Sequence, residues 1–184
     1  MSFRLVTISS IVSCLLLLGL QCANAQRFTI ENGNVTFFSK ATIEDIKSEN
    51  KKIQSIFNAS SGNIAFSVPV REFQFEKQLM QEHFNDKYME SQKFPTSTFA
   101  GKVVGYDLSQ QAAQNVHAVG KLTIHGISKE VDIPGVIEIA GDHIVLKSAM
   151  KVKLADYGVN IPKLLWQNIA EHVDVTVNLS YKQQ

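Results

Sequence analysis

A regular alternation of apolar and polar residues is the feature that most constrains the fold of this chain. It is clearest near the C-terminus, where single polar residues separate Val173, Val175, Val177, Leu179 and Tyr181. Residues 64–70 and 144–154 alternate in the same way, with one break at Ser148. A period of two places successive side chains on opposite faces of a strand, so one face is apolar and the other polar. The pattern predicts a mainly β protein.

Further strands are expected over residues 27–31, 34–41, 52–59, 96–106, 115–125 and 129–139. Turn residues separate several of these runs, as in Ser60-Ser61-Gly62-Asn63 and Ala140-Gly141-Asp142. Consecutive strands joined by short turns form an antiparallel meander, and closing such a sheet into a barrel removes its exposed edges. The sequence contains no internal repeat or linker, which indicates one domain.

Residues 72–91 break the period of two. The stretch contains no Gly or Pro, and Pro95 follows it. Its apolar residues recur in steps of four, at Phe75 and Leu79 and again at Met80, Phe84 and Tyr88. This spacing predicts an amphipathic α-helix that covers one end or flank of the sheet and turns its apolar face toward the barrel. A second irregular region, residues 156–167, is expected to be a long functional loop or a short helical turn before the last strand.

The first 25 residues have the features of a cleaved signal peptide. Arg4 precedes a mostly apolar run over residues 5–20, and Ala23-Asn24-Ala25 has the small-x-small form of a cleavage site. A membrane anchor would need about 20 apolar residues, more than this run provides. Lipoprotein processing at Cys14 is the other alternative, but leucines follow this cysteine, where the apolar run normally ends. We therefore expect a leader over residues 1–25 and an exported domain over residues 26–184, periplasmic or secreted.

Charge and cysteine content exclude several classes of function. The chain has 18 basic and 17 acidic residues, and one of the basic residues, Arg4, belongs to the expected leader. The remaining neutral domain lacks the basic stripe that nucleic-acid binding requires, so no nucleic-acid partner is expected. Both cysteines, Cys14 and Cys22, also lie in the leader. The exported domain would then have neither a disulfide nor a cysteine-ligated metal.

The sequence contains no local motif for catalysis, a metal or a cofactor. Its histidines do not form the paired spacing of a zinc hydrolase helix, and there is no Gly-x-Ser-x-Gly elbow or Gly-rich phosphate loop. We therefore predict no catalytic residue, no metal ligand and no cofactor. His83 and His125 are expected to be hydrogen-bond partners within the fold, with contact to a ligand as the alternative.

Phenylalanine supplies the positive signal, since the chain contains 11 of these residues and many fall on strand faces or in the expected helix. These rings either form an ordinary core or line an apolar cavity. An eight-stranded barrel is just wide enough to be filled by its own side chains or to enclose one small ligand. The sequence is compatible with both options.

Three motifs resemble the YceI-like family. The longest, LMQEHFNDKYMESQKFPTSTF over residues 79–99, joins a helix to a strand that follows Phe-Pro. GKLTIHGISK over residues 120–129 and DYGV over residues 156–159 agree with it, and the resemblance covers nearly the whole mature chain. It implies an antiparallel eight-stranded, lipocalin-like β-barrel with one covering α-helix. It also implies export and the binding of polyisoprenoids or other long-chain amphiphiles inside the barrel.

The leading hypothesis is an exported, non-enzymatic protein that carries or sequesters a long-chain lipid or isoprenoid. One alternative is a structural or interaction module whose barrel is filled by side chains, and the other is a cryptic lipid-processing enzyme. Transient contact with a membrane is compatible with the leading hypothesis. The sequence predicts no particular oligomeric state.

The residues expected to contact the lipid are Phe66, Phe75, Leu79, Phe84, Tyr88, Phe94, Phe99, His125 and Trp166. Trp166 is alternatively part of the core, or part of a contact with a partner or membrane. Arg71 and Lys93 are the candidates for an anionic head group, because guanidinium and ammonium groups pair with phosphate or carboxylate oxygens.

Overall fold

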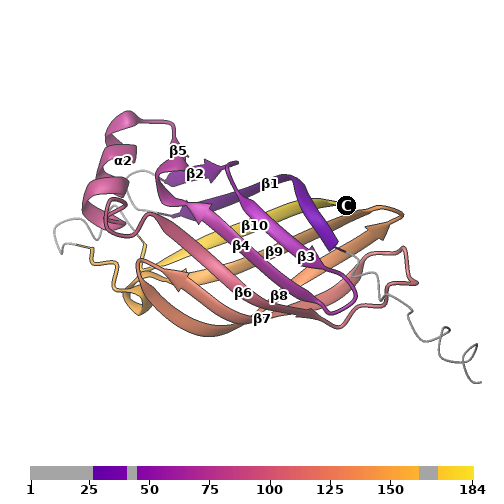
Figure 1. Cartoon of the computed structure of the whole chain (residues 1–184). Helices are drawn as coiled ribbons and strands as arrows, with labels where there is room; N and C mark the ends of the chain where they lie inside the picture. Colours follow the sequence, from indigo (N-terminus) through magenta and orange to yellow (C-terminus); the bar gives the residue numbers. More distant parts are fainter. Residues whose placement is uncertain (1–26, 41–44, 162–169) are drawn as a thin grey trace, which may run out of the picture.

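The computed structural model describes residues 27–40, 45–161 and 170–184 (Figure 1). The expected leader and Trp166 lie outside these residues. Among the described helices, none is both long enough and apolar enough to cross a membrane.

Eight antiparallel strands close into an elongated barrel, which confirms the predicted fold class (Figure 1). In chain order these strands are β1 (Arg27–Ser39), β3 (Gln54–Asn58), β4 (Asn63–Pro69), β6 (Thr96–Val104), β7 (Gln114–Ile124), β8 (Ile127–Ala140), β9 (His143–Lys153) and β10 (His172–Gln183). Around the barrel they follow the order β1-β10-β9-β8-β7-β6-β4-β3, and the pairing of β3 with β1 completes the ring. Closure gives each strand a partner on both sides, as expected for a meander that removes its edges.

β1 has three partners and is longer than predicted. The expected strands over residues 27–31 and 34–41 are one strand, in which the register against β10 shifts between Ile30 and Asn32. A bulge of this kind bends a strand without ending it. The first residues of β1 pair with β3, and its last residues pair with β2 (Ile46–Asn50), which pairs in turn with β5 (Gln74–Phe75). β2 and β5 thus extend the sheet at the end of the barrel that carries the helix (Figure 1).

Apolar alternation does not reveal β2, because its buried residues are polar. Ser48 and Asn50 are 2% and 0% exposed. Ser48 Oγ donates a hydrogen bond to the Gln74 carbonyl at 2.8 Å, and Asn50 Nδ2 donates to the Pro69 carbonyl at 2.7 Å. These bonds satisfy polar groups that would otherwise be costly to bury. They also tie β2 to the segment that leads from β4 into the helix.

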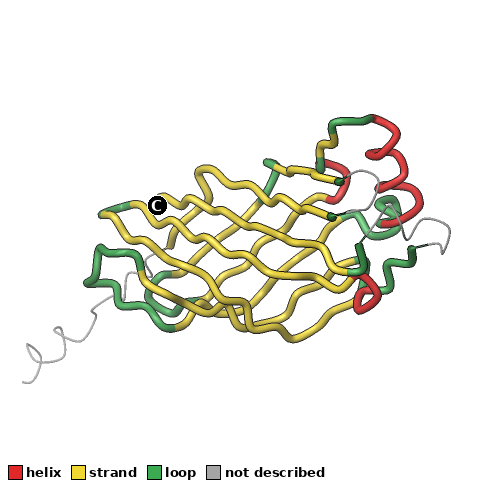
Figure 2. The backbone as a smooth tube through the Cα atoms, turned by 180° about the vertical axis from the view of Figure 1, so that it is seen from behind, coloured by secondary structure: helices red, strands yellow, loops and turns green. Residues whose placement is uncertain are grey.

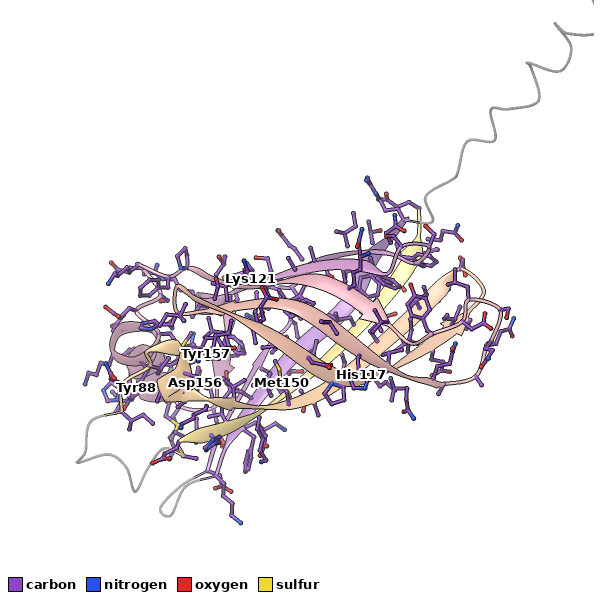
Figure 3. The ribbon with its side chains drawn as sticks, turned by 90° about the horizontal axis from the view of Figure 1, so that it is seen from below. Tyr88, His117, Lys121, Met150, Asp156 and Tyr157 are labelled. Atoms are coloured by element: carbon purple, nitrogen blue, oxygen red, sulfur yellow. The ribbon has the colours of Figure 1, made fainter. Side chains whose placement is uncertain are left out.

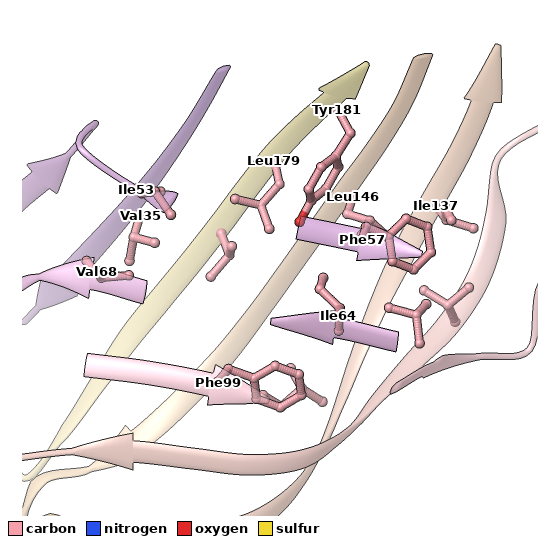
Figure 4. Close-up of a cluster of buried hydrophobic side chains, with 14 of the residues drawn as sticks. Val35, Ile53, Phe57, Ile64, Val68, Phe99, Ile137, Leu146, Leu179 and Tyr181 are labelled. Atoms are coloured by element: carbon pink, nitrogen blue, oxygen red, sulfur yellow. The ribbon is translucent and has the colours of Figure 1, made fainter. Parts of the chain in front are cut away.

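Apolar side chains occupy most of the half of the barrel away from the helix, among them Phe57, Ile64 and Tyr181 (Figure 4). Phe57, Ile137 and Tyr181 project into it from different strands and are fully buried. The Tyr181 hydroxyl lies 2.6 Å from Ser55 Oγ, which itself donates to the Ala65 carbonyl. Burial raises the pKa of Tyr181, so its hydroxyl stays protonated. This half forms the solid core of the domain.

The helix is shorter than predicted and lies over one end of the barrel (Figures 1 and 2). Residues 70–72 form a 3₁₀ turn and β5 pairs with β2, so helical structure begins only at α2 (Gln78–His83). α2 continues into a π-helical turn, η3 (Phe84–Tyr88), which gives 11 helical residues in all. The Met89 N–H donates to the Phe84 carbonyl at 2.8 Å, the five-residue spacing of a π turn.

Only part of the predicted apolar face of the helix meets the barrel. Met80 and Phe84 line the interior, whereas Leu79 is 61% exposed. Phe75, which the four-residue spacing placed on the same helical face as Leu79, belongs instead to β5. The late start of the helix therefore places Leu79 in its first turn, on the solvent side. A short 3₁₀ turn, η4 (Leu154–Tyr157), overlaps the start of the irregular region predicted over residues 156–167, of which residues 162–167 lie outside the described part of the chain.

Candidate ligand cavity

The half of the barrel beneath the helix is hollow. It contains a cavity of about 450 Å³, whose walls come from β1, β4, β6, β7, β9 and β10 and whose roof is formed by the helix. Many wall residues have short side chains: Val35, Val68, Val152, Val173, Val175 and Val177. Since an eight-stranded barrel is barely wide enough to stay open, side-chain size decides whether its interior is filled. Valines leave this half open, so side chains do not fill the barrel along its whole length.

Four phenylalanine rings, named here the phenylalanine cluster, join the helix to the barrel. Phe84 stacks against Phe37 of β1, with ring centroids 5.5 Å apart and an interplanar angle of 18°. Phe73 and Phe75 contact the Phe84 ring at centroid distances of 5.6 and 5.0 Å. All four rings line the cavity. The cluster therefore anchors the helix and supplies part of the cavity surface.

The charged and titratable groups of the cavity lie on the helix. His83, Lys87 and Tyr88 line it there, and no carboxylate is among the lining residues within the described part of the chain. Lys87 Nζ lies 3.1 Å from His83 Nε2. An ammonium group can only donate, so the imidazole accepts this bond through Nε2 and is neutral in this arrangement. Burial raises the pKa of Tyr88, which keeps its hydroxyl protonated.

Lys87 is exposed, whereas His83 and Tyr88 are half-buried. Figure 3 shows Tyr88 at the end of the barrel and Met150 nearer the middle. The cavity therefore runs from a polar end that carries a positive charge, next to solvent, into an apolar interior. It has the polarity of a site for an amphiphile.

The sequence profile of the YceI-like domain family matches residues 20–181 of the chain. This chain belongs to the YceI-like family. Comparison with curated proteins gives no match.

Solved structures share the fold of this YceI-like chain at low sequence identity. BcnA of Burkholderia cenocepacia is 17% identical with a TM-score of 0.69, and the alignment covers 80% of this chain and 95% of that one. A structure from Saccharophagus degradans, described as a polyisoprenoid binding domain implicated in plant cell wall breakdown, is 14% identical with a TM-score of 0.74, covering 85% and 98%. The YceI protein of Campylobacter jejuni is 16% identical with a TM-score of 0.55, covering 90% and 88%.

The structure brings together four of the residues expected to contact a lipid. Phe66, Phe75, Phe84 and Tyr88 all line the large cavity of the YceI-like barrel. Phe99 does not: it is 2% exposed and borders only a smaller cavity of about 60 Å³ deeper in the barrel.

Phe94 and His125 lie outside both cavities and contact each other, with ring centroids 4.4 Å apart. His125 Nε2 is 3.0 Å from Glu90 Oε2, and His125 Nδ1 is 3.2 Å from the Tyr157 carbonyl. Glu90 and His125 both have positive φ angles, 42° and 50°. His125 lies in the β7–β8 turn and therefore connects this turn to the end of the helical segment and to η4. This is the role of a hydrogen-bond partner, the first of the two options considered for it.

The basic side chains that line the cavity are different from the two cations selected by sequence. Arg71 is exposed and donates through Nε to Ser91 Oγ at 3.3 Å, and Lys93 lies over the outer Phe94 ring with Nζ 4.9 Å from its centroid. His83 and Lys87 take the place by the cavity instead. The sequence signal that could have identified His83 and Lys87 is their spacing, because residues 80, 83, 84 and 87 fall on one helical face. Within the described residues, no three metal-ligating side chains gather.

Proposed function

We propose that this protein binds the apolar tail of a single amphiphile inside its barrel and acts as a carrier or sequestering protein without catalysing a reaction. The observation that supports this is the cavity of about 450 Å³ with its largely apolar lining. Ligand sites in proteins typically measure about 300–1,000 Å³ and combine apolar walls with a few polar groups. The description of the Saccharophagus degradans structure as a polyisoprenoid binding domain points to the same class of ligand.

The polar end of the cavity favours a head group that is anionic or accepts hydrogen bonds. Lys87 is the charged group at this end, and no described lining residue carries a carboxylate that would compete with the ligand for it. Tyr88 and Lys87 can both donate to a carboxylate or phosphate oxygen. His83 accepts from Lys87 and would hold the ammonium at the cavity.

Tail burial would supply most of the affinity. Each methylene removed from water contributes about 0.8 kcal/mol, so a ten-carbon tail contributes about 8 kcal/mol. Association and ordering of the ligand oppose this gain. The balance is enough for useful affinity without a charge clamp.

We further propose that the chain is exported after cleavage following Ala25, which would place the barrel in the periplasm or outside the cell. The exposed Leu79 on the helix, beside the cavity, would suit transient contact with a membrane during loading or release. In this role the protein would need neither a cofactor nor a nucleic-acid partner.

Native mass spectrometry of the protein purified from its own compartment, with organic extraction, tests the proposed function. A co-purifying molecule with an apolar tail is expected, at one per barrel. Phe84→Asp places a carboxylate among the phenylalanine cluster and should remove this ligand, whereas Leu79→Asp on the outer side of the same helix should retain it. An apo mass for the native protein, together with no binding of fatty or prenyl probes, would contradict the proposal.

A further inference from the structure

The interior of the barrel is divided into two cavities of unequal size. The large cavity beneath the helix measures about 450 Å³, and a second one of about 60 Å³ lies deeper. Of the residues that the structure describes, only Phe66, Met150 and Val177 line both. These three side chains, named here the floor, stand between the two spaces.

Beyond the floor the barrel is closed by its own core. Phe66 stacks on Phe99, with ring centroids 5.6 Å apart and an interplanar angle of 23°. Further along, Phe57 and Tyr181 contact each other at 5.9 Å and are both fully buried. A tail that enters from the helix end therefore meets packed side chains part-way along the barrel.

From this geometry we infer that the floor limits the length of the bound tail to about a dozen carbons. The inference rests on the proposed function and adds a ligand class to it: a medium-chain amphiphile with an anionic head at Lys87. At about 30 Å³ per water-sized group, 450 Å³ holds about 15 such groups, head group included. A polyisoprenoid longer than about three units would leave part of its chain outside the cavity.

Met150 is the replaceable part of this floor. Phe66 is held in a stacked pair and Val177 is already short. Met150 is unbranched and flexible, so its side chain sets the depth without serving as a structural anchor. On the helix, Met80 lines the same cavity near His83 and offers a control of identical chemistry.

Binding of saturated n-alkyl carboxylates from C8 to C20 tests the inference, measured by calorimetry on the protein after delipidation. Each added methylene should strengthen binding about fourfold until the tail reaches the floor. In the wild type this gain should stop at about C12–C15, the length set by the cavity volume. Binding of every length with a gain that continues to C20 would overturn the length limit and leave the proposed function intact. Binding of none of these carboxylates would overturn the inference, and it would overturn the proposed function as well if prenyl probes also fail to bind.

Variants locate the stop. Met150→Ala removes three side-chain heavy atoms and joins the smaller cavity to the larger. The chain length at which the gain in affinity stops, named here the break, should therefore increase by about three to five carbons. A C18 carboxylate should then bind at least about tenfold tighter than it binds the wild type. Met80→Ala gains its space beside the head group and should leave the break unchanged. Val175 pairs with Met150 in the β9–β10 register, so Val175→Phe narrows the cavity next to Met150. This variant should lower the break by about three carbons. It tests the floor independently of how well Met150→Ala folds. Equal breaks in all variants would overturn the inference.

Discussion

Replacement of Phe84 by alanine tests whether the phenylalanine cluster holds the helix on the barrel. The substitution removes ring contacts with Phe37, Phe73 and Phe75, at centroid distances of 5.5, 5.6 and 5.0 Å. Each aromatic pair contributes about 0.5–1.5 kcal/mol beyond the burial of area, and Phe→Ala in a core lowers stability by about 3–5 kcal/mol. Because Phe84 is half-buried and already borders a cavity, we expect the free energy of unfolding to fall by about 2–4 kcal/mol.

Urea unfolding followed by circular dichroism measures this change, with Leu79→Ala as the control. Leu79 lies in the first turn of the same helix but is 61% exposed. A substitution there should change the free energy of unfolding by no more than about 0.5 kcal/mol. A loss below about 1 kcal/mol for Phe84→Ala, or equal losses in the two variants, would refute the argument that the cluster anchors the helix.

The remaining predictions concern the head group, the solid core and the closure of the barrel. Lys87→Met should weaken binding of an alkyl carboxylate about tenfold and leave the alcohol of the same length unaffected; equal losses for both ligands would contradict a charged head-group contact. Tyr181→Phe should lower the free energy of unfolding by only about 1 kcal/mol in urea titration, because Ser55 Oγ keeps its bond to the Ala65 carbonyl. A loss above about 3 kcal/mol would contradict this modest contribution of the Tyr181 hydroxyl. Gly101→Ala should destabilise by about 1–3 kcal/mol, since a Cβ there would collide with the backbone of Gly120 on the neighbouring strand; an unchanged melting temperature would show that β6 and β7 can separate locally.

The barrel could be predicted from the sequence because its strands expose one face to water and bury the other. β10 keeps this alternation from Val173 to Tyr181, and β4 and β9 repeat it with a single polar exception in β9, Ser148. That exception has a partner in the structure, where Ser148 Oγ donates to the Pro134 carbonyl at 2.8 Å. Period-two patterning survives such a substitution, since the hydroxyl has a hydrogen-bond partner.

The end of the barrel that carries the site is harder to predict because its structure depends on pairings between distant segments. The sequence over residues 72–77 is compatible with a helix, but β5 pairs with β2, which displaces the helix start to Gln78. β2 itself depends on the buried side chains of Ser48 and Asn50, whose carbonyl partners lie 26 and 19 residues away in sequence. A one-residue change in where a helix begins rotates every side chain on it by about 100°. For this reason the spacing of apolar residues predicted a helical face turned toward the barrel, but not that His83 and Lys87 would line a cavity there.

The position of the hollow follows from the size of the residues on strands that run the whole length of the barrel. β10 contributes valines at its start, by the helix, and Leu179 and Tyr181 at its end, so one strand both lines the cavity and fills the core. Unfilled apolar space forgoes the contacts that stabilise a core. A ligand tail would restore these contacts and stabilise the folded state in proportion to its occupancy. The β1–β3 pairing that completes the ring, with Phe28 opposite Phe57, lies in the solid half, so the sheet stays closed there while the open half exchanges its contents.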